Sequence, residues 1–340
     1  MFSDKQPRKV FVLSKRLMCL FAHKECYFGT KHAGSNEDQL GSRPKYNYGL
    51  TGKGKSKRRK IQDFPTIHGE VVFGLHPVYL ALQAERRSKF HTLYIDGKFV
   101  ETGHRNKAIE KVLEVARHKN IRIHPLSKLF LDQLAGNRPH QGVCLDSDEL
   151  DVTEWTYETE VSSSHHGMPI WLLLHNILDP MNLGAILRTA YYLGLDKVVL
   201  PAADCCRLSP VVSKASAGAL EVIDLVRLPK HVSEITLCEW WQSRGWEVVG
   251  TTLDDPDQTD GNASIQSLYS FSATRPTMVL LGNEGFGVGS DLLQACDTLV
   301  TIPSYEKTYT GLPRISSLNV SVAAGILLHW IKVSNLTQER

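Results

Sequence analysis

Residues 171–200 read WLLLHNILDPMNLGAILRTAYYLGLDKVVL and contain two apolar runs with an amphipathic stretch between them. The runs Trp171–Leu174 and Lys197–Leu200 predict buried strands, and Asn182–Leu193 predicts a helix for which Asn182 is a suitable N-cap. A helix that joins two strands in this way is the unit of a parallel sheet. The stretch therefore predicts an α/β fold, with a helix whose buried face consists of Leu183, Ile186, Leu187, Ala190 and Leu193.

The same alternation of strand and helix patterns extends over residues 169–334. The further strands are expected at Val222–Val226, Glu247–Thr251, Met278–Leu281 and Leu299–Ile302, and the further helices at Pro210–Ala217, Val232–Arg244, Ser290–Ala295 and Ser317–Lys332. Repeated strand–helix units favour a mostly parallel sheet that is covered on both faces. Ligands of such sheets bind beyond the carboxyl ends of the strands, so the residues that follow strands are the candidates for a site.

Two segments that precede this region differ from it in composition. Residues 67–145 alternate short strand and helix patterns and predict a smaller α/β domain, and 340 residues are enough for two domains. Residues 146–168 are acidic and then polar, which predicts a linker. His165 and His166 lie in it without a cysteine or acid at ligand spacing, so we expect a solvated loop and no metal site.

The composition excludes several classes of protein. The chain is 42% hydrophobic and 22% charged, as is typical of a globular protein. Its longest apolar stretch, Leu318–Ile331, is too short to cross a bilayer and predicts a buried helix, so no membrane partner is expected. The seven cysteines form no C-x-x-C pair, which argues against a zinc ribbon or disulfide framework and favours reduced intracellular thiols.

Residues 1–60 are strongly basic, with 15 lysines and arginines against four acids, whereas residues 61–340 have 24 against 32. A basic, acid-poor start predicts a mitochondrial targeting segment followed by a disordered linker, and a basic arm without an address is the alternative. Gly49–Ser56 matches the phosphate-loop pattern G-x-x-x-x-G-K-S, but no apolar strand precedes it and no amphipathic helix follows it. We therefore do not expect a nucleotide-hydrolysing enzyme.

The segments that follow the predicted strands Trp171–Leu174 and Met278–Leu281 contain a cation, Arg188, and an acid, Glu284, respectively. Arg188 lies about 140° around the predicted helix from Leu183, so it points away from the core. Gly282–Gly289 holds four glycines, which permit close approach of the backbone to a ligand. Its one acid, Glu284, could act as a base, bind a cation or pair with Arg188.

The third segment follows the strand that ends at Ile302. Ser316 or Ser317 could cap the helix that comes next, which is otherwise nearly all apolar. If that helix is buried, the side-chain amide of Asn319 must find hydrogen-bond partners. Asn319 is therefore a candidate site residue.

Together these segments resemble the three motifs of the SpoU (TrmH-like) branch of the SPOUT RNA methyltransferases. The resemblance rests on Asn182-x-Gly184-x-x-x-Arg188, Leu281-Gly282-Asn283-Glu284-Gly285-x-Gly287, and Ile302-Pro303 with Ser317-Leu318-Asn319-Val320-Ser321-Val322-Ala323. It covers about residues 169–332. Residues 69–145, with Gly74-Leu75-His76-Pro77-Val78 near their start, are similar to the small ribosomal-protein-like (L30e/L7Ae-like) RNA-binding domain that often precedes such enzymes.

The resemblance implies a C-terminal domain that is folded as a trefoil knot, binds S-adenosylmethionine and works as a homodimer. The residues that would hold the cofactor, largely through backbone groups, are Gly282, Ile302 and Leu318. The residues that would form the reaction centre are Asn182, Arg188, Glu284, Ser317 and Asn319. The stretch 304–315 is longer than the corresponding stretch of compact bacterial members. We expect it either to contact RNA or to be a plain loop insertion.

The nearest likeness is to enzymes that methylate a guanosine ribose in large-subunit rRNA, and the basic leader is typical of mitochondrial members. The resemblance thus implies an RNA (ribose-2′-O)-methyltransferase of the mitochondrial matrix, with 16S-type large-subunit rRNA or the assembling ribosome as partner. Two alternatives stay open. One is the same chemistry on tRNA, and the other is an RNA-binding assembly factor that kept the fold without turnover.

Overall fold

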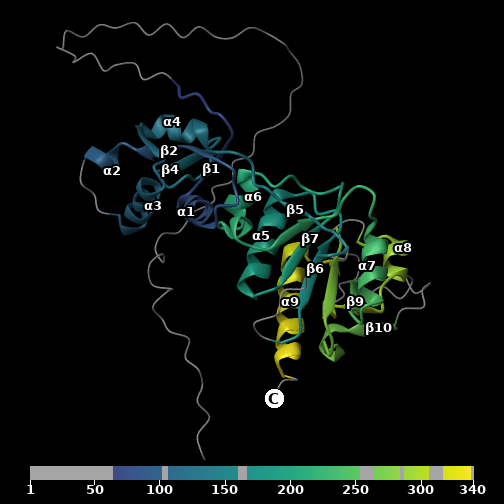
Figure 1. Ribbon diagram of the computed structural model, residues 1–340. Coiled ribbons are helices and arrows are strands. Elements are labelled where there is room, and N and C mark those ends of the chain that lie inside the picture. Colours follow the sequence, from purple (N-terminus) through teal and green to yellow (C-terminus); the bar gives the residue numbers. More distant parts are fainter. Residues whose placement is uncertain are drawn as a thin grey trace, which may run out of the picture. The chain divides into compact units, whose positions relative to one another are not determined.

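The computed structural model describes residues 64–101, 106–159, 167–252, 264–283, 287–305 and 317–337 (Figure 1). The predictions for residues 1–60, His165, His166 and Glu284 lie outside these ranges. A trefoil knot depends on the path of residues 306–316, which also lie outside them, so the knot stays a prediction.

A first sheet is formed by four described strands in the order β1-β4-β2-β3. β4 runs antiparallel to both β1 and β2, while β3 is parallel to β2. The strands are β1 (Glu70–Phe73), β2 (Phe90–Asp96), β3 (Arg122–Leu126) and β4 (Val143–Ser147). The helices are α1 (Leu75–Ala84) and α3 (Lys107–His118) on one face, α4 (Lys128–Leu134) on the other, and α2 (Lys98–Glu101) after β2.

Local sequence explains where α3 begins and which face it buries. Asn106 Oδ1 accepts a hydrogen bond from the backbone N–H of Ala108 at 3.0 Å, as an N-cap does. Ile109, Val112 and Ala116 recur at helical spacing and are buried against the sheet. The cap and the apolar spacing therefore account for a helix that begins after Asn106 and ends at His118.

A second sheet contains eight of the described strands, in the order β10-β12-β9-β11-β6-β7-β8-β5, and each is parallel to its neighbours. In chain order the strands are β5 (Thr153–Glu154), β6 (Ile170–Leu174), β7 (Lys197–Leu200), β8 (Leu225–Arg227), β9 (Glu247–Thr251), β10 (Ser264–Ser267), β11 (Thr277–Leu281) and β12 (Thr298–Thr301). The predicted α/β class, with a mostly parallel sheet after a smaller domain, is confirmed.

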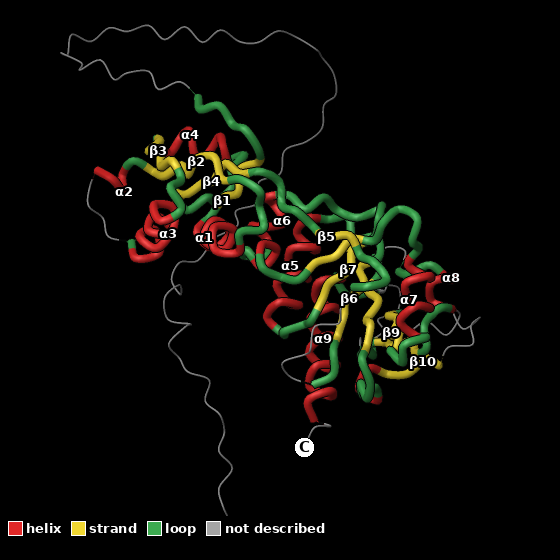
Figure 2. Tube along the Cα trace, viewed as in Figure 1, coloured by secondary structure: helices red, strands yellow, loops and turns green. Residues whose placement is uncertain are grey.

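Helices cover both faces of this sheet. They are α5 (Pro180–Tyr192), α6 (Pro210–Ala215), α7 (Glu234–Gln242), α8 (Ser290–Gln294) and α9 (Val320–Thr337). Leu172 and Leu174 of β6 pack with α5, α6 and α9, whereas Trp171 and Leu173 pack with α7 and α8. Figure 2 shows the two groups of helices on opposite sides of the strands. A strand buried on both faces is apolar at every position, which made β6 recognisable in the sequence.

The structure corrects the region around β8. The predicted strand Val222–Val226 begins only at Leu225, because Ala219–Glu221 form a 3₁₀ helix, η1. The predicted helix Pro210–Ala217 ends at Ala215, since Ala217 and Gly218 both adopt positive φ. A right-handed helix cannot continue through such residues.

The segment 146–168 is more than a polar connection. β4 extends into it as far as Ser147, and Thr153–Glu154 add strand β5 next to β8. Trp155 is buried among the side chains of the α7–α8 face. This aromatic residue anchors the segment because its burial removes a large apolar surface from water.

Three other described elements, α2, β10 and the 3₁₀ helix η3 (Leu268–Ser270), were not predicted. None of the helices in the described ranges is long and apolar enough to span a membrane.

Candidate active site

The loop after β6 leads into α5 by a different cap from the one predicted. Asp179 Oδ1 accepts hydrogen bonds from the backbone N–H groups of Met181 and Asn182, both at 2.8 Å. Pro180 occupies the first turn, where a missing N–H costs nothing. The prediction of Asn182 as N-cap was therefore wrong, because Asp179 satisfies the first N–H groups and leaves the Asn182 side chain for another role.

Asn182 and Asn319 meet across the site. Asn319 Nδ2 donates a hydrogen bond to Asn182 Oδ1 at 3.1 Å. Asn319 Oδ1 accepts from the backbone N–H of Ser321 at 3.0 Å and from its Oγ at 2.6 Å, so Asn319 caps α9. The predicted helix start at Ser317 shifts to Val320, and Asn319 is exposed at the helix end rather than buried within it.

Gly184 explains the close contact between α5 and α6. A Cβ at this position would lie 2.4 Å from Ala215 Cβ and 2.9 Å from the backbone nitrogen of Ser216. No side chain fits such a gap. The glycine of the first motif therefore allows the helix of Asn182 and Arg188 to pack directly on α6.

Arg188 is exposed, as predicted, and lies about 9 Å further along α5 than Asn182. It lines a groove of about 450 Å³ between α5 and α9. The other residues that line the groove are Thr189, Tyr192, Leu193, Gly325 and His329. The structure thus places Arg188 on the same pair of helices as Asn182 and Asn319, facing an open groove.

The loop after β11 is held tightly to the loop after β6. A Cβ on Gly282 would lie 2.5 Å from the carbonyl oxygen of Gly287, so a side chain here would force the turn apart. Asn283 and Gly287 exchange two backbone hydrogen bonds, at 3.1 and 2.9 Å. Asn283 Nδ2 donates to the carbonyl oxygen of Asn176 at 2.8 Å. The first and second motifs therefore share one edge of the sheet, because β6 and β11 are neighbours.

The remaining predicted residues lie on the connecting segments. Ile302 follows β12 and is half-buried, and β9 separates its strand from β11. Ser317 and Leu318 precede the cap of α9, where Leu318 exposes 46% of its surface. Glu284 lies outside the described ranges. Within those same ranges, histidine, cysteine and acidic side chains form no group of three or more that could hold a metal.

Sequence reasoning missed one polar pair at this edge. His175 Nδ1 donates to Glu234 Oε1 at 2.8 Å, and Asn176 Nδ2 lies 3.0 Å from His175 Nε2. The hydrogen bond with Glu234 outweighs burial and raises the pKa of His175. Its position directly after β6 was the signal that could have revealed it.

Comparison with known proteins agrees with this arrangement. Residues 169–329 match the sequence profile described as SpoU rRNA Methylase family, and residues 71–152 match RNA 2′-O ribose methyltransferase substrate binding. The human protein named rRNA methyltransferase 1, mitochondrial, is 39% identical over 272 residues, which are 78% of this chain and 73% of that protein. The 23S rRNA (guanosine-2′-O-)-methyltransferase RlmB of Pseudomonas syringae is 30% identical over 76% of this chain and 93% of that one.

A solved structure shares the fold. The SpoU methyltransferase AviRb from Streptomyces viridochromogenes, in complex with AdoMet, superposes with a TM-score of 0.57 at 22% identity. The match covers 79% of this chain and 89% of that one. The profile matches, the relatives and the shared architecture together show that this chain belongs to the SpoU rRNA methylase family.

Proposed function

We propose that this protein transfers a methyl group from S-adenosylmethionine to the ribose 2′-hydroxyl of a guanosine in mitochondrial large-subunit rRNA. Membership of the SpoU family supports the reaction. The names of the relatives support the substrate, since one is a mitochondrial rRNA methyltransferase and another a guanosine-2′-O-methyltransferase. The observation that carries the proposal is the Asn182–Asn319 hydrogen bond, which joins the first and third motifs at one place.

The residues proposed for the cofactor fit its chemistry. Leu318 and Ile302 offer apolar surface for a flat base, and Leu318 is exposed beside the cap of α9. Gly282 lies in a turn whose backbone comes too close for any side chain, so main-chain groups are what this position can offer a ligand. When bound, S-adenosylmethionine supplies a methyl carbon on a cationic sulfur, so that the ribose oxygen forms the new O–C bond as the C–S bond breaks and the hydroxyl proton leaves.

Arg188 is proposed to hold the RNA and to stabilise the developing negative charge on the attacking oxygen. A guanidinium stays protonated in proteins, so Arg188 cannot accept the proton. Asn182, Asn319 and Ser317 would orient the hydroxyl, because alignment of two reactants is the main requirement of this transfer. Glu284 would order Asn182 and Arg188 or accept the proton, and a pH–rate profile of Glu284→Gln that matches wild type would exclude the second role.

We also propose that the protein works as a homodimer through the α5–α9 face. Tyr192 exposes 86% of its surface there, and Tyr191 and Val322 are exposed on the same two helices. Aromatic residues exposed together mark contact surfaces on soluble proteins. The open groove beside Arg188 would then be completed by the second copy.

The basic residues 1–60 and the mitochondrial relatives support a mitochondrial location, and we propose the matrix as the compartment. The substrate would be the free rRNA or the assembling subunit. An RNA made in that compartment is the one that the enzyme would meet.

In the test, the full chain is incubated with methyl-labelled S-adenosylmethionine and mitochondrial large-subunit rRNA. A separate reaction contains total tRNA in place of the rRNA. Label at one rRNA ribose, absent in Asn319→Ala, is the expected result. Asn106→Ala is the matched control, since it removes the N-cap of α3 away from the site. Label in tRNA would show that the substrate is tRNA. If folded protein binds the cofactor and labels neither RNA, the result would favour an RNA-binding assembly factor without turnover.

A further inference from the structure

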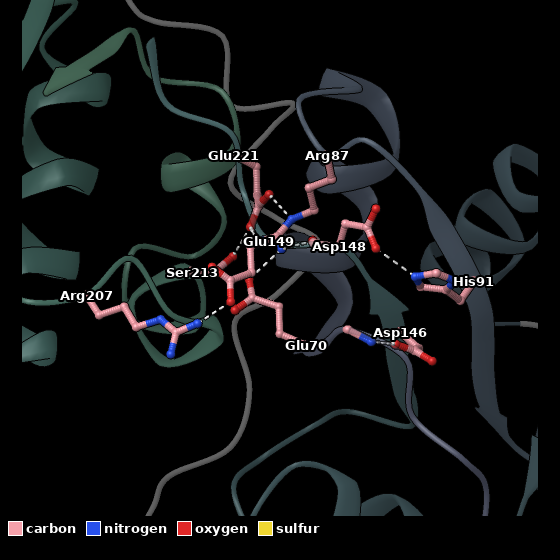
Figure 3. Close-up of polar contacts among 10 residues, drawn as sticks. Glu70, Arg87, His91, Asp146, Asp148, Glu149, Arg207, Ser213 and Glu221 are labelled. Carbon is pink, nitrogen blue, oxygen red and sulfur yellow. Dashed lines mark hydrogen bonds and ion pairs between the residues drawn. The ribbon is translucent and has the colours of Figure 1, made fainter. Parts of the chain in front are cut away.

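The side chain of Arg87 is fully buried although it carries a charge. Its Nε and Nη2 donate to the two carboxylate oxygens of Glu221 at 2.8 and 2.9 Å. Its Nη1 donates to Glu70 Oε1 at 2.6 Å and to the carbonyl oxygen of Asp148 at 2.9 Å. Arg87 follows α1 of the smaller domain and Glu221 ends η1 of the methyltransferase domain, so the pair joins the two (Figure 3).

The acidic side of this pair is equally well bound. Glu221 is almost completely buried and also accepts a hydrogen bond from Ser213 Oγ, in α6, at 2.6 Å. Burial is the largest single influence and would lower the pKa of Arg87, but the hydrogen bonds and charges of Glu221 and Glu70 together outweigh it and raise that pKa. Buried charges are tolerated where each is paired and hydrogen-bonded, and the planar guanidinium matches a carboxylate in a way that an ammonium cannot.

Other contacts tighten the same boundary. Arg86 Nη1 donates to the carbonyl oxygen of Ile223 at 2.5 Å, and Lys214 Nζ donates to Gln141 Oε1 at 2.9 Å. A Cβ on Gly218 would lie 3.1 Å from the carbonyl oxygen of His76. The smaller domain is therefore held at several points along η1 and α6.

The boundary between the two domains is connected to the candidate active site by helix packing. Ser213 lies on α6, and α6 packs on α5 where Gly184 leaves room for Ala215. α5 carries both Asn182 and Arg188. A displacement of Glu221 from Arg87 would therefore shift α6 through Ser213, and α6 packs directly on the helix that carries Asn182 and Arg188.

We propose that the Arg87–Glu221 pair fixes the orientation of the smaller domain relative to the α5–α9 site, which makes both residues positioning residues for RNA methylation. The inference rests on the proposed function, because it takes the smaller domain to bind the RNA that α5 and α9 modify. An RNA that contacts two rigidly linked sites gains affinity through effective concentration, and a loose joint loses that gain. A short RNA that reaches only one site gains nothing from the joint.

The test compares Arg87→Met with wild type on two RNAs that carry the target nucleotide, a long rRNA fragment and a short hairpin. For the long RNA we expect KM to rise about tenfold while kcat stays within about twofold. The hairpin KM and the cofactor Kd should not change. Arg207→Met is the matched control, because the exposed Arg207–Glu149 ion pair spans the same boundary (Figure 3).

An unchanged long-RNA KM in folded Arg87→Met protein would overturn the proposal, as would an equal loss on both RNAs, which indicates general damage. If that variant does not fold, Glu221→Gln keeps the shape of the pair without its charge, and the same selective rise in KM is expected. If wild type methylates neither RNA, the proposed function fails. The role of the Arg87–Glu221 pair is then tested separately, by comparing the affinity of wild type and variant for the long RNA.

Discussion

The side-chain amide of Asn319 donates to Asn182 Oδ1 at 3.1 Å across 137 residues of sequence, while its oxygen caps α9 through the backbone N–H of Ser321. One side chain thus both begins a helix and positions a residue of another helix. This double use explains why an asparagine stands where serine or aspartate would cap equally well.

Asn319→Ser separates the two roles. Serine caps a helix about as well as asparagine, so the free energy of unfolding should change by less than about 0.5 kcal/mol. The shorter side chain cannot reach Asn182, so kcat should fall about 10- to 100-fold through misalignment. Asn106→Ser makes the same exchange at the cap of α3, and activity there should stay at wild-type level. Equal activity of the two variants in a methyl-transfer assay would contradict the positioning role of Asn319.

Arg188→Ala should lower kcat about 10²- to 10³-fold, since it removes the charge proposed to stabilise the attacking oxygen. The residue is exposed, so thermal unfolding should shift little. Single-turnover rates with saturating RNA measure the effect. Arg207→Ala, at another exposed arginine, is the control, and near-normal turnover by Arg188→Ala would refute the proposed mechanism.

Gly184→Ala should destabilise the protein by about 1–3 kcal/mol, because the added methyl group collides with Ala215 and with the backbone of α6. Urea unfolding measures this change. Gly325, in α9, is the comparison, since a Cβ there meets nothing within 4 Å and Gly325→Ala should stabilise by about 0.5–1 kcal/mol. Equal stabilities of the two variants would show that α5 and α6 can move apart at no cost.

Tyr192→Glu tests the proposed homodimer. A charge placed on the exposed α5–α9 face should convert the protein to monomers in sedimentation velocity, because a buried unpaired carboxylate is costly. Tyr305 is exposed to a similar degree, 82% against 86%, on the segment after β12. Tyr305→Glu should therefore leave the dimer intact, and dissociation by both variants would place the interface elsewhere.

The His175–Glu234 pair predicts a pH dependence of stability. The raised pKa of His175 means that its stabilisation is complete below the unfolded value of about 6.5 and is lost as the pH rises through the folded value. In Glu234→Gln the melting temperature should depend less on pH than in wild type, when both are measured between about pH 5.5 and 8.5. Exchange of the exposed His118 for glutamine should leave the pH dependence of the melting temperature unchanged. If Glu234→Gln keeps the wild-type dependence, other groups cause it.

The strands could be predicted because their burial on both faces leaves a continuous apolar pattern. β7 and β9 have the predicted bounds, β6 and β11 begin one residue earlier than predicted, and β12 is displaced by one residue at both ends. β5 escaped prediction because two residues in an acidic segment carry no periodicity, and only Trp155 among its neighbours is apolar and buried. The cap of α5 was misplaced because Asp179 and Asn182 are both good capping residues, and Pro180 in the first turn decides for Asp179.

The sequence by itself determined the alternation of strands and helices and the three loops that follow β6, β11 and β12, because hydrophobic period and glycine spacing are local properties. The tertiary structure alone decided that Asn182 meets Asn319, that Gly184 admits α6, and that Arg87 pairs with Glu221. These relationships join residues far apart in the chain, and no local pattern records which of many polar side chains will share one small volume. Burial selects the Arg87–Glu221 pair, since a charged group that leaves water must find its partner within hydrogen-bond distance.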